Sequence, residues 1–440
     1  MSSEQKSIRF GDLLTSEGTR NGIYKSKEFH GRGAKIVNMG ELFAYPRLFN
    51  IEMKRVDIDS GERGKFSLKA GDLLFARRSL VAEGAGKCSI VKEVEGATVF
   101  ESSIIRARVD ATKADSEYLY YTFSSVVGRN LLGTILRQTA VSGITGTDLV
   151  ELEVPLPPVA NQKAIAHILG TLDDKIELNR KTNETLEAMA KALFKSWFVD
   201  FDPVKAKAEG RSTGLPAEIS DLFPDSFEDS ELGEIPCGWE TGRLDEILEI
   251  DPPRQLKRGS VSPYLEMKGV PTSGHSAVDV ILREFSSGSK FRNGDTLLAR
   301  ITPCLENGKT AFVDFLKDGE IGWGSTEFIV MCGRREEANP FAYYLARSEV
   351  FRNNAIQNMV GSSGRQRVLS DAVSGFTLPL PPEEILVKFG LLATYLMRRI
   401  SANADQSVIL SKIRDTLLPK LISGEIRIPD AEKMLREVGV

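Results

Sequence analysis

The stretch "VPLPPVANQKAIAHILGTLDDKI", residues 154–176, begins with closely spaced prolines and continues as a long amphipathic run. A second stretch, "LPLPPEEILVKFGLLATYLMRRI" at residues 378–400, has the same layout 224 residues later. Proline restricts its own φ angle and disfavours helix in the residue before it, so each PLPP stretch predicts an extended segment that leads into a helix. The chain therefore contains the same extended segment and helix twice.

Other landmarks repeat at nearly the same spacing. A shift of 223 places "GDLLFAR" (71–77) on "GDTLLAR" (294–300), and each is followed by a Gly-Lys pair. The same shift places Tyr120-Tyr121 on Tyr343-Tyr344 and Asp148 on Asp371. Self-similarity at one period over most of a chain indicates a tandem duplication.

Each copy mixes strand and helix patterns. "KAGDLLFARR" and "RNGDTLLARI" predict a Gly-Asp turn before a buried strand, and "TAFVDFL" and "TEFIVMC" predict further strands. "SEYLYYTFSSVVGRNLL" and "PFAYYLARSEVFRNNAI" predict helices. We therefore expect an α+β protein with two similar globular domains and two long helices. The predicted parts are the domains 1–154 and 237–378, the helices 155–200 and 379–424, a connecting segment 201–236 and a C-terminal tail 425–440.

Both long helices carry a heptad pattern. The first has its seam at Ile165, Leu169, Leu172, Ile176, Asn179, Asn183, Leu186, Ala190, Leu193 and Trp197. Adding 224 gives Phe389, Ala393, Leu396, Ile400, Asn403, Ser407, Leu410, Arg414, Leu417 and Leu421. Arg414 interrupts the second seam, and Pro419 should end that helix. The residues expected to pair the helices are Leu172, Ile176, Asn179, Asn183 and Leu186 with Leu396, Ile400, Asn403, Ser407 and Leu410.

A polar pair lies in the middle of each apolar seam. Such a pair costs stability but selects one register, because its amides must find partners. Antiparallel packing into a coiled coil would bring the two polar pairs together and relate the copies by a pseudo-two-fold axis. In the alternative, each helix packs only on its own domain. The charged residues Asp173, Asp174, Lys175, Glu177, Arg180 and Lys181 would contact a partner or remain solvated.

Composition narrows the class of protein. The 440 residues are 41% hydrophobic, with no apolar run long enough for a membrane span and no visible signal peptide. The four cysteines and three histidines are scattered, which favours a reducing cytoplasm and leaves no metal site in the pattern. The net charge of −4 argues against indiscriminate coating of nucleic acid, although a local basic face is compatible with it.

Three segments are similar to motifs of catalytic or nucleotide-binding sites, but each of them lacks a required residue. "DPPR" (251–254) is similar to the Asp-Pro-Pro-aromatic motif of amino-methyltransferases, but Arg254 replaces the aromatic ring. "ENGKT" and "GAGKC" lack the first glycine of a phosphate loop, with Pro303 and Val81 in its place. A binding protein is therefore favoured over an enzyme.

Duplex DNA is a ligand with two similar faces, because its grooves recur every ~34–36 Å. A helix of about 39 residues spans roughly 58 Å, enough to separate two domains by one turn. Basic and amide side chains on glycine-rich loops are the expected contacts, since arginine pairs with guanine and Asn or Gln with adenine. The candidates are Arg77, Arg78, Lys87, Arg137, Gln138, Arg300, Lys309, Arg365, Gln366 and Arg367.

Three longer segments resemble a known family. Residues 155–210, from "PLPPVANQ" to "KAKAEG", closely resemble the first conserved helical region of type I restriction–modification specificity subunits. "LGEIPCGWETGRLDEIL" (232–248) resembles the opening of their target recognition domains, and "GSSGRQRV" with the second PLPP resembles the exit into the second helix. The first domain departs from this pattern, because it lacks the "GEIPxGW" opening and starts at "KSIRFGDLL".

The resemblance implies a sequence-reading subunit. Each recognition domain would read one half of a bipartite target in double-stranded DNA, and the helices would set the gap and dock two modification subunits. Restriction subunits would add a motor and nuclease. This chain would carry no cofactor, whereas S-adenosylmethionine, ATP and Mg²⁺ would bind to the partners. The alternatives are a stand-alone DNA-modifying enzyme with an unfamiliar site and a protein-only scaffold.

Overall fold

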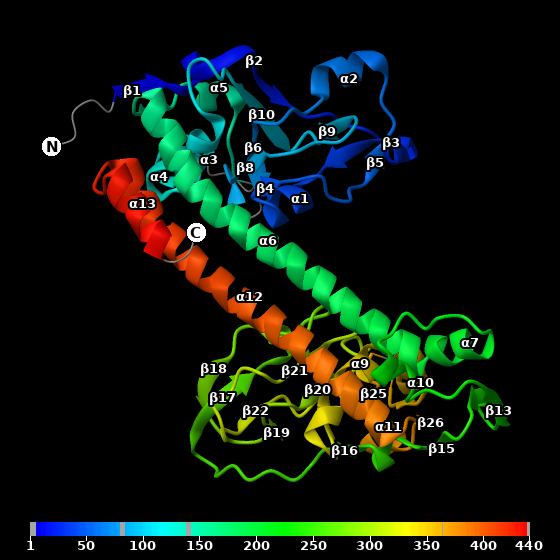
Figure 1. The fold of residues 1–440 in the computed structure, drawn as a ribbon. Coiled ribbons are helices and arrows are strands. Elements are labelled where there is room, and N and C mark those ends of the chain that lie inside the picture. Colours follow the sequence, from blue (N-terminus) through cyan, green and yellow to red (C-terminus); the bar gives the residue numbers. More distant parts are fainter. Residues whose placement is uncertain (1–5, 80–83, 138–141, 363, 438–440) are drawn as a thin grey trace. The chain divides into compact units, whose positions relative to one another are not determined.

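The computed structural model describes residues 6–79, 84–137, 142–362 and 364–437 (Figure 1). It divides into two compact units, one formed by Met1–Leu178 with Gln406–Val440 and the other by Asn179–Asp405. The long helices α6 (Val159–Phe198) and α12 (Glu383–Ser423) each contribute residues to both units. Within the described ranges, no helix is both long and apolar enough to cross a membrane.

The first unit is built around a five-stranded sheet with the order β2-β10-β6-β8-β4. A three-stranded sheet, β5-β3-β9, packs beside it, and two strand pairs, β1-β12 and β7-β11, complete the described strands. The strands are β1 (Lys6–Arg9), β2 (Leu14–Asn21), β3 (His30–Val37), β4 (Arg47–Leu48), β5 (Arg55–Val56), β6 (Asp72–Ala76), β7 (Arg78–Ser79), β8 (Cys88–Val91), β9 (Thr98–Phe100), β10 (Ile104–Val109), β11 (Ser142–Gly143) and β12 (Glu153–Leu156).

Helices cover one face of this sheet. Asp115 and Ser125 cap α3 and α4, because their side chains accept hydrogen bonds from the backbone N–H groups of Tyr118 and Gly128. The rings of Phe75 and Phe123, from β6 and α3, meet edge-to-face at 5.1 Å in the core. The helices of this unit besides α6 and α12 are α1 (Met39–Ala44), α2 (Ser60–Phe66), α3 (Ser116–Ser124), α4 (Val126–Thr134), α5 (Gly146–Val150) and α13 (Ile428–Glu437).

The second unit repeats this plan with two four-stranded sheets, β16-β23-β20-β21 and β18-β17-β22-β19. Its strands are β13 (Phe227–Ser230), β14 (Gly233–Pro236), β15 (Glu240–Arg243), β16 (Leu248–Ile250), β17 (Val261–Leu265), β18 (Ile281–Glu284), β19 (Ser289–Phe291), β20 (Thr296–Ala299), β21 (Thr310–Phe312), β22 (Gly322–Gly324), β23 (Phe328–Gly333), β24 (Met359–Val360), β25 (Arg367–Val368) and β26 (Thr377–Leu380). Its shorter helices are α7 (Asp202–Ala208), α8 (Ala217–Ser220), α9 (Asn339–Arg347), α10 (Glu349–Gln357) and α11 (Ser370–Ser374). The α+β class with two similar domains and two long packed helices is thus confirmed.

Both Gly-Asp turns lead into a buried strand, as the sequence predicts. Gly71 and Gly294 have φ angles of 87° and 91°, a left-handed conformation that favours glycine. The side chain of Asp72 then accepts a hydrogen bond from the backbone N–H of Lys69, and Asp295 does the same with Arg292, both at 2.8 Å. Each turn therefore buries one carboxylate at the start of a central strand.

The two buried carboxylates have different arginine partners. Arg108 on β10 holds Asp72 through two hydrogen bonds of 2.7 Å, and it also bonds to Glu17. In the second unit, Arg254 from the loop after β16 pairs with Asp295. Burial raises the pKa of Asp295 to about 6, although hydrogen bonds and the Arg254 charge act in the opposite direction. Both turns therefore contain a buried aspartate, but its arginine partner comes from β10 in the first unit and from the loop after β16 in the second.

The opening strands of the two domains pair with equivalent strands. β1 pairs antiparallel with β12, and β15 pairs antiparallel with β26. Both pairs join the first residues of a domain to the PLPP stretch that precedes its long helix. The "KSIRFGDLL" start of the first domain therefore forms a strand even though the "GEIPxGW" opening is missing.

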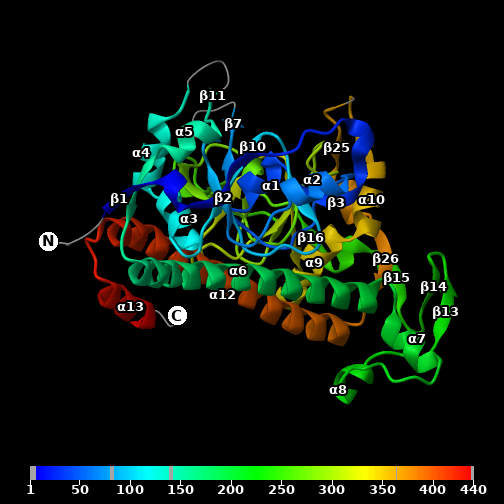
Figure 2. The ribbon, with the colours of Figure 1, turned by 90° about the horizontal axis from the view of Figure 1, so that it is seen from above.

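The connecting segment 201–236 is folded. Helices α7 and α8 and the β13-β14 hairpin occupy it, and Phe201 packs edge-to-face on Trp239 at 5.6 Å. Figure 2 shows α7, α8 and the hairpin grouped beyond the C-terminal end of α6. In the first unit, the predicted C-terminal tail similarly contains α13, whose Ala431 and Leu435 are buried against the core.

In the second unit, α6 and α12 pack antiparallel through their polar residues. Asn403 Nδ2 donates to Asn183 Oδ1 at 2.8 Å, Asn183 donates to the carbonyl of Ile400 at 3.1 Å, and Asn179 donates to the carbonyl of Asn403 at 3.2 Å. Beyond them, the rings of Phe194 and Phe389 meet at 5.9 Å. As residue numbers rise along α6, the numbers of their contacts on α12 fall, so the two helices run antiparallel.

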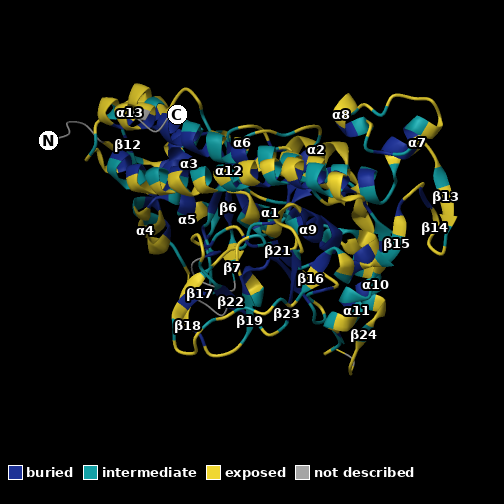
Figure 3. Ribbon diagram, turned by 60° about the horizontal axis from the view of Figure 1, so that its bottom comes forward, coloured by how far each residue is buried: buried dark blue, intermediate teal, exposed yellow. Residues whose placement is uncertain are grey.

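The remaining seam positions also lie on packed faces. In the first unit, Leu410 and Leu417 of α12 share one core with Leu172 of α6, while Ile176 packs against it and Ser407 is half-buried. In the second unit, Leu186 and Leu396 are half-buried and Ile400 is buried. Figure 3 shows exposed residues along the outer faces of the two helices.

Two expectations for the helices were wrong. Pro419 lies inside α12, which continues to Ser423, because the missing N–H of proline removes a single helical hydrogen bond, the one to the carbonyl of exposed Asp415. Asp173 is not on an exposed face but buried, and its carboxylate accepts from Arg414 at 2.6 Å and from the hydroxyl of Tyr121 at 2.7 Å. Arg414 therefore interrupts the apolar seam as one half of an ion pair.

Candidate nucleic-acid interface

In the first unit, the predicted basic loops meet in a short ribbon (Figure 2). β7 pairs with β11 through Ser79 with Ser142 and Arg78 with Gly143, and the backbone of Arg137 exchanges two hydrogen bonds with Gly143. A Cβ on Gly143 would lie 2.9 Å from the carbonyl oxygen of Arg77, so glycine allows this close approach. The loop after β6 and the loop before α5 are thereby joined.

The second unit has the corresponding ribbon. β24 pairs with β25, and Ile301 forms an isolated bridge with Arg367. The backbone N–H of Thr302 donates to the carbonyl of Gln366, and that of Val368 donates to the carbonyl of Arg300, both at 3.0 Å. In both units, therefore, the loop after the buried Gly-Asp strand lies against the loop that precedes α5 or α11.

The arginines on these ribbons differ in how firmly they are held. Arg78 and Arg365 have exposed side chains. Arg137 is paired with Asp148 at 2.7 Å, and Arg367 makes three hydrogen bonds to Glu327, whose proximity raises the pKa of the Arg367 guanidinium. Arg137 and Arg367 are thus each oriented by a carboxylate, and the Arg137 side chain is at the same time 63% exposed.

Two other candidates donate to the backbone instead. Arg77 Nη1 donates to the carbonyl of Ser102 at 3.3 Å, and Arg300 Nε donates to the carbonyl of Val368 at 3.1 Å. Both guanidiniums therefore help to hold the ribbon loops in place, and the rest of each side chain is half-buried.

The two Gly-Lys lysines have equivalent structural contacts. Lys87 Nζ donates to the carbonyl of Phe43 at 3.0 Å and lies 4.9 Å from the centre of its ring. Lys309 Nζ donates to the carbonyl of Met267 at 2.7 Å. Gln138 lies outside the described residues, and Gln366 is half-buried. The DNA-contacting role of all ten candidates remains a prediction.

The "DPPR" segment has a structural role. Asp251 adopts a φ of 51°, and its carboxylate accepts hydrogen bonds from the backbone of Val330 at 2.9 Å and the hydroxyl of Ser370 at 2.6 Å. Arg254 is buried against Asp295. Asp251 is thus bound to β23 and α11, and Arg254 is bound to the aspartate that precedes β20. The described residues include no cluster of three or more potential metal-ligating His, Cys, Asp or Glu side chains.

A buried histidine that sequence reasoning passed over joins the second domain to its helices. His275 Nε2 lies 3.3 Å from Asp314 and 3.1 Å from Ser401 on α12, and Nδ1 lies 3.8 Å from Glu187 on α6. Burial alone would lower the pKa of His275, but the two carboxylates raise it to about 9. No local pattern identifies this cluster, because its members lie on four segments far apart in sequence.

Comparison with known proteins agrees with this architecture. A family model described as the Type I restriction modification DNA specificity domain matches residues 3–188. The MjaIX specificity subunit of Methanocaldococcus jannaschii is 28% identical over 72% of this chain and 70% of that protein. The HindI specificity subunit of Haemophilus influenzae is 24% identical over 83% of this chain and 88% of its own. In fold, the S subunit of a type I restriction–modification system from M. genitalium superposes with a TM-score of 0.56 at 16% identity, covering 96% of this chain and 97% of that one.

Two α+β units that share a pair of long helices, together with these relatives, define the class of DNA specificity proteins. Within that class, the chain is similar to the specificity subunits of type I restriction–modification systems.

Proposed function

We propose that this chain selects the DNA target of a type I restriction–modification complex. Each α+β unit reads one half of a bipartite sequence, and the paired helices set the number of unread base pairs between the halves. The observation that supports this most directly is the repeated ribbon, which presents exposed Arg78 in one unit and exposed Arg365 in the other. Exposed arginines on narrow ribbons suit the major groove, where a guanidinium can pair with guanine.

A domain exchange tests the two-reader proposal. Replacing residues 1–153 with the corresponding domain of a relative should change one half of the methylated sequence and leave the other half unchanged. Methylated adenines mapped across a host genome give the readout. A change in both halves would contradict the assignment of one half to each unit.

The helices provide an independent test. Adding one heptad to α6 and one to α12 keeps the seam in register and lengthens each helix by about 10 Å. We expect the gap between the halves to change while both half-sequences persist. An unchanged gap in the methylation map would remove the spacing role from the helices.

We also propose that the outer face of α12 docks the modification subunits. In the second unit, Leu391 and Tyr395 are 58% and 63% exposed and lie one helical turn apart. Large apolar side chains on one exposed helical stripe are typical of a protein interface. Leu391→Asp with Tyr395→Asp should abolish co-purification with a modification subunit, whereas Lys412→Asp on an exposed position of the same helix should not.

On this proposal, the catalytic sites lie in the partner subunits. The relatives are named as specificity subunits of restriction enzymes, which favours a recognition role for this chain. S-adenosylmethionine would bind to the modification subunits, and ATP and Mg²⁺ to restriction subunits. The purified chain alone should therefore leave DNA unmethylated and uncut when given all three.

A further inference from the structure

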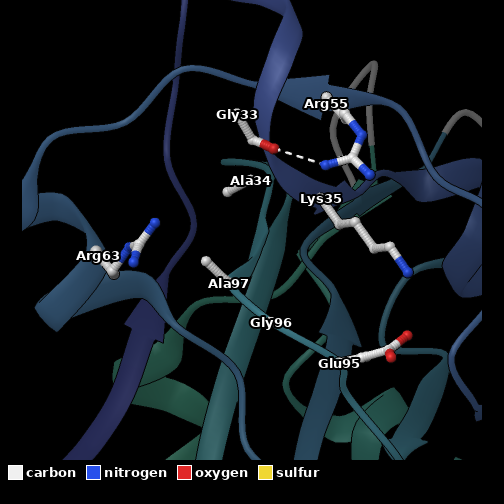
Figure 4. A pocket seen from close by; sticks show the side chains of 8 residues that line it. All are labelled: Gly33, Ala34, Lys35, Arg55, Arg63, Glu95, Gly96 and Ala97. Carbon is white, nitrogen blue, oxygen red and sulfur yellow. Dashed lines mark hydrogen bonds between the residues drawn. The ribbon is translucent and has the colours of Figure 1, made fainter.

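The first unit contains a basic hollow that none of its predicted DNA contacts lines. Its volume is about 440 Å³, within the roughly 300–1,000 Å³ typical of small-molecule sites. Lys35 on β3, Arg55 on β5 and Arg63 on α2 surround it, and Glu95 is the single acidic residue in its wall (Figure 4). The lining therefore carries three positive charges against one negative charge. The remaining lining residues are Gly33, Ala34, Gly96 and Ala97.

Strand register places two of the cations side by side. Lys35 and Arg55 are direct cross-strand partners of β3 and β5, so their side chains leave the same face of the small sheet. The neighbouring pair, Ala34 with Val56, faces the buried side. Figure 4 shows Arg63 across the hollow from Arg55 and Lys35. The cations thus approach the space from three different elements, β3, β5 and α2.

Hydrogen bonds orient two of these side chains. Arg55 Nη1 donates to the carbonyl of Gly33 at 2.9 Å, which leaves its other nitrogens available (Figure 4). Lys35 Nζ donates to Asn50, which in turn donates to Glu95. The acidic side chain is therefore tied to a neighbouring amide, and the guanidiniums of Arg55 and Arg63 supply most of the free donors.

Two glycines in the wall of the hollow adopt left-handed backbone conformations. Gly33 has a φ of 89°, and a Cβ there would lie 2.6 Å from the carbonyl oxygen of Val56, so a side chain would push β3 away from β5. Gly96 has a φ of 70° and open space where a Cβ would stand. Both conformations favour glycine and leave backbone close to the empty space.

The second unit has no counterpart of the three cations of this arrangement. Ile36 pairs with Val99 in the first unit as Tyr264 pairs with Trp323 in the second, which places Pro263 at the position of Lys35. Leu282, the cross-strand partner of Pro263, then stands for Arg55 and is 72% exposed. The chain between β18 and β20 contains strand β19 instead of a helix like α2, which carries Arg63. The basic hollow is therefore specific to the first unit and is no general consequence of the fold.

We infer that this hollow binds a phosphate group, supplied either by the backbone of duplex DNA or by a free nucleotide. Two forked guanidiniums and an ammonium around an open space match the charge and the oxygen acceptors of phosphate. The inference deepens the proposed function, because a backbone phosphate held there would position the first unit on DNA without reading sequence.

The test uses the full-length chain with Arg55→Gln and Arg63→Gln combined, and with Arg129→Gln on α4 as the matched control of an exposed arginine outside the hollow. One arm measures binding of duplexes with and without the target over a range of salt. A second arm measures binding of inorganic pyrophosphate and ATP without DNA by calorimetry. Circular dichroism and thermal unfolding verify that each variant is folded.

If the phosphate comes from DNA, the double variant should bind every duplex about tenfold more weakly, with the slope of log K against log salt reduced by about 1 to 2. Its preference among half-sequences should persist. If the phosphate comes from a nucleotide, the second arm should lose its signal instead. Equal behaviour of the double variant, the control and the parent in both arms would overturn the inference, and retained half-sequence choice would show that the proposed function stands without it.

Discussion

Asp173 on α6 accepts a hydrogen bond from Arg414 on α12 at 2.6 Å, across 241 positions of sequence. The hydroxyl of Tyr121, from α3, donates to the other oxygen of the same carboxylate at 2.7 Å. Burial alone would lower the pKa of Arg414, but Asp173 and Asp415 raise it above the ordinary value. One buried carboxylate thus connects the globular part of the first unit with both helices.

Removing the arginine should leave that carboxylate buried without its counter-charge. We expect Arg414→Ala to lower the free energy of unfolding by about 3 kcal/mol, measured by urea denaturation. Arg427→Ala, which removes an exposed arginine paired with Asp430, is the control and should change stability little. Equal effects of the two substitutions would contradict the role of the buried pair.

The His275 cluster should make stability depend on alkaline pH. A pKa raised to about 9 means that the folded state holds a proton that the unfolded chain releases near pH 6.5. The contribution, of about 3 kcal/mol, is therefore complete below pH 6.5 and is lost as the pH rises through 9. Unfolding free energies measured between pH 6 and 10 should show this decline in the parent.

His275→Gln should remove most of the decline, because glutamine cannot carry the charge. His167→Gln, which changes an exposed histidine on α6, is the matched control and should retain the slope of the parent. A parent whose stability stayed level from pH 6 to 9 would refute the assigned titration.

The polar pair in the helix seam should behave as a coupled unit. Asn403→Leu alone leaves the amide oxygen of Asn183 without its donor, so we expect a loss of about 1–2 kcal/mol. Asn183→Leu with Asn403→Leu should recover stability, because both positions then fit the apolar seam. A double-mutant cycle by urea denaturation gives the coupling, and additive effects would show that the two amides act independently.

In the second unit, a substitution on the ribbon should affect DNA binding, whereas a substitution of the Gly-Lys lysine should affect stability. Arg365→Ala changes an exposed side chain and should weaken DNA binding about tenfold with unchanged thermal unfolding. Lys309→Ala removes the donor to the Met267 carbonyl and should lower the unfolding temperature. The reverse assignment of effects, measured by fluorescence anisotropy and calorimetry, would contradict this division.

Much of the fold could be predicted because the same sequence patterns occur in both copies of the repeat. The Gly71 and Gly294 turns, the tyrosine pairs and the two PLPP stretches each appear in both copies, so one interpretation supports the other. The heptad steps likewise place Asn183 and Asn403 in a common seam before any coordinates are known. Local periodicity and turn chemistry are short-range signals, and the sequence displays them directly.

The candidate site was less predictable, because its pairings are long-range. Asp173 occurs within a run of charged residues and gives no sign that Tyr121 and Arg414 bury it. The hollow depends on cross-strand register between Lys35 and Arg55, which are separated in sequence by α1 and β4. Register of this kind emerges only when the strands pair. The ten predicted contacts likewise include lysines whose carbonyl partners no motif reveals.

The separate arginines of Asp72 and Asp295 bear on how such chains can diversify. Genetic crossovers inside α6 or α12 would exchange each carboxylate together with its own arginine, Arg108 or Arg254, and both halves of the hybrid would retain neutralised cores. A crossover that joins part of one domain to the rest of the other, near the equivalent strands β6 and β20, would give a hybrid domain with one aspartate. That hybrid would contain either both arginines or neither of them. Viable shuffling should therefore concentrate its junctions in the helices, where natural variants can be sought.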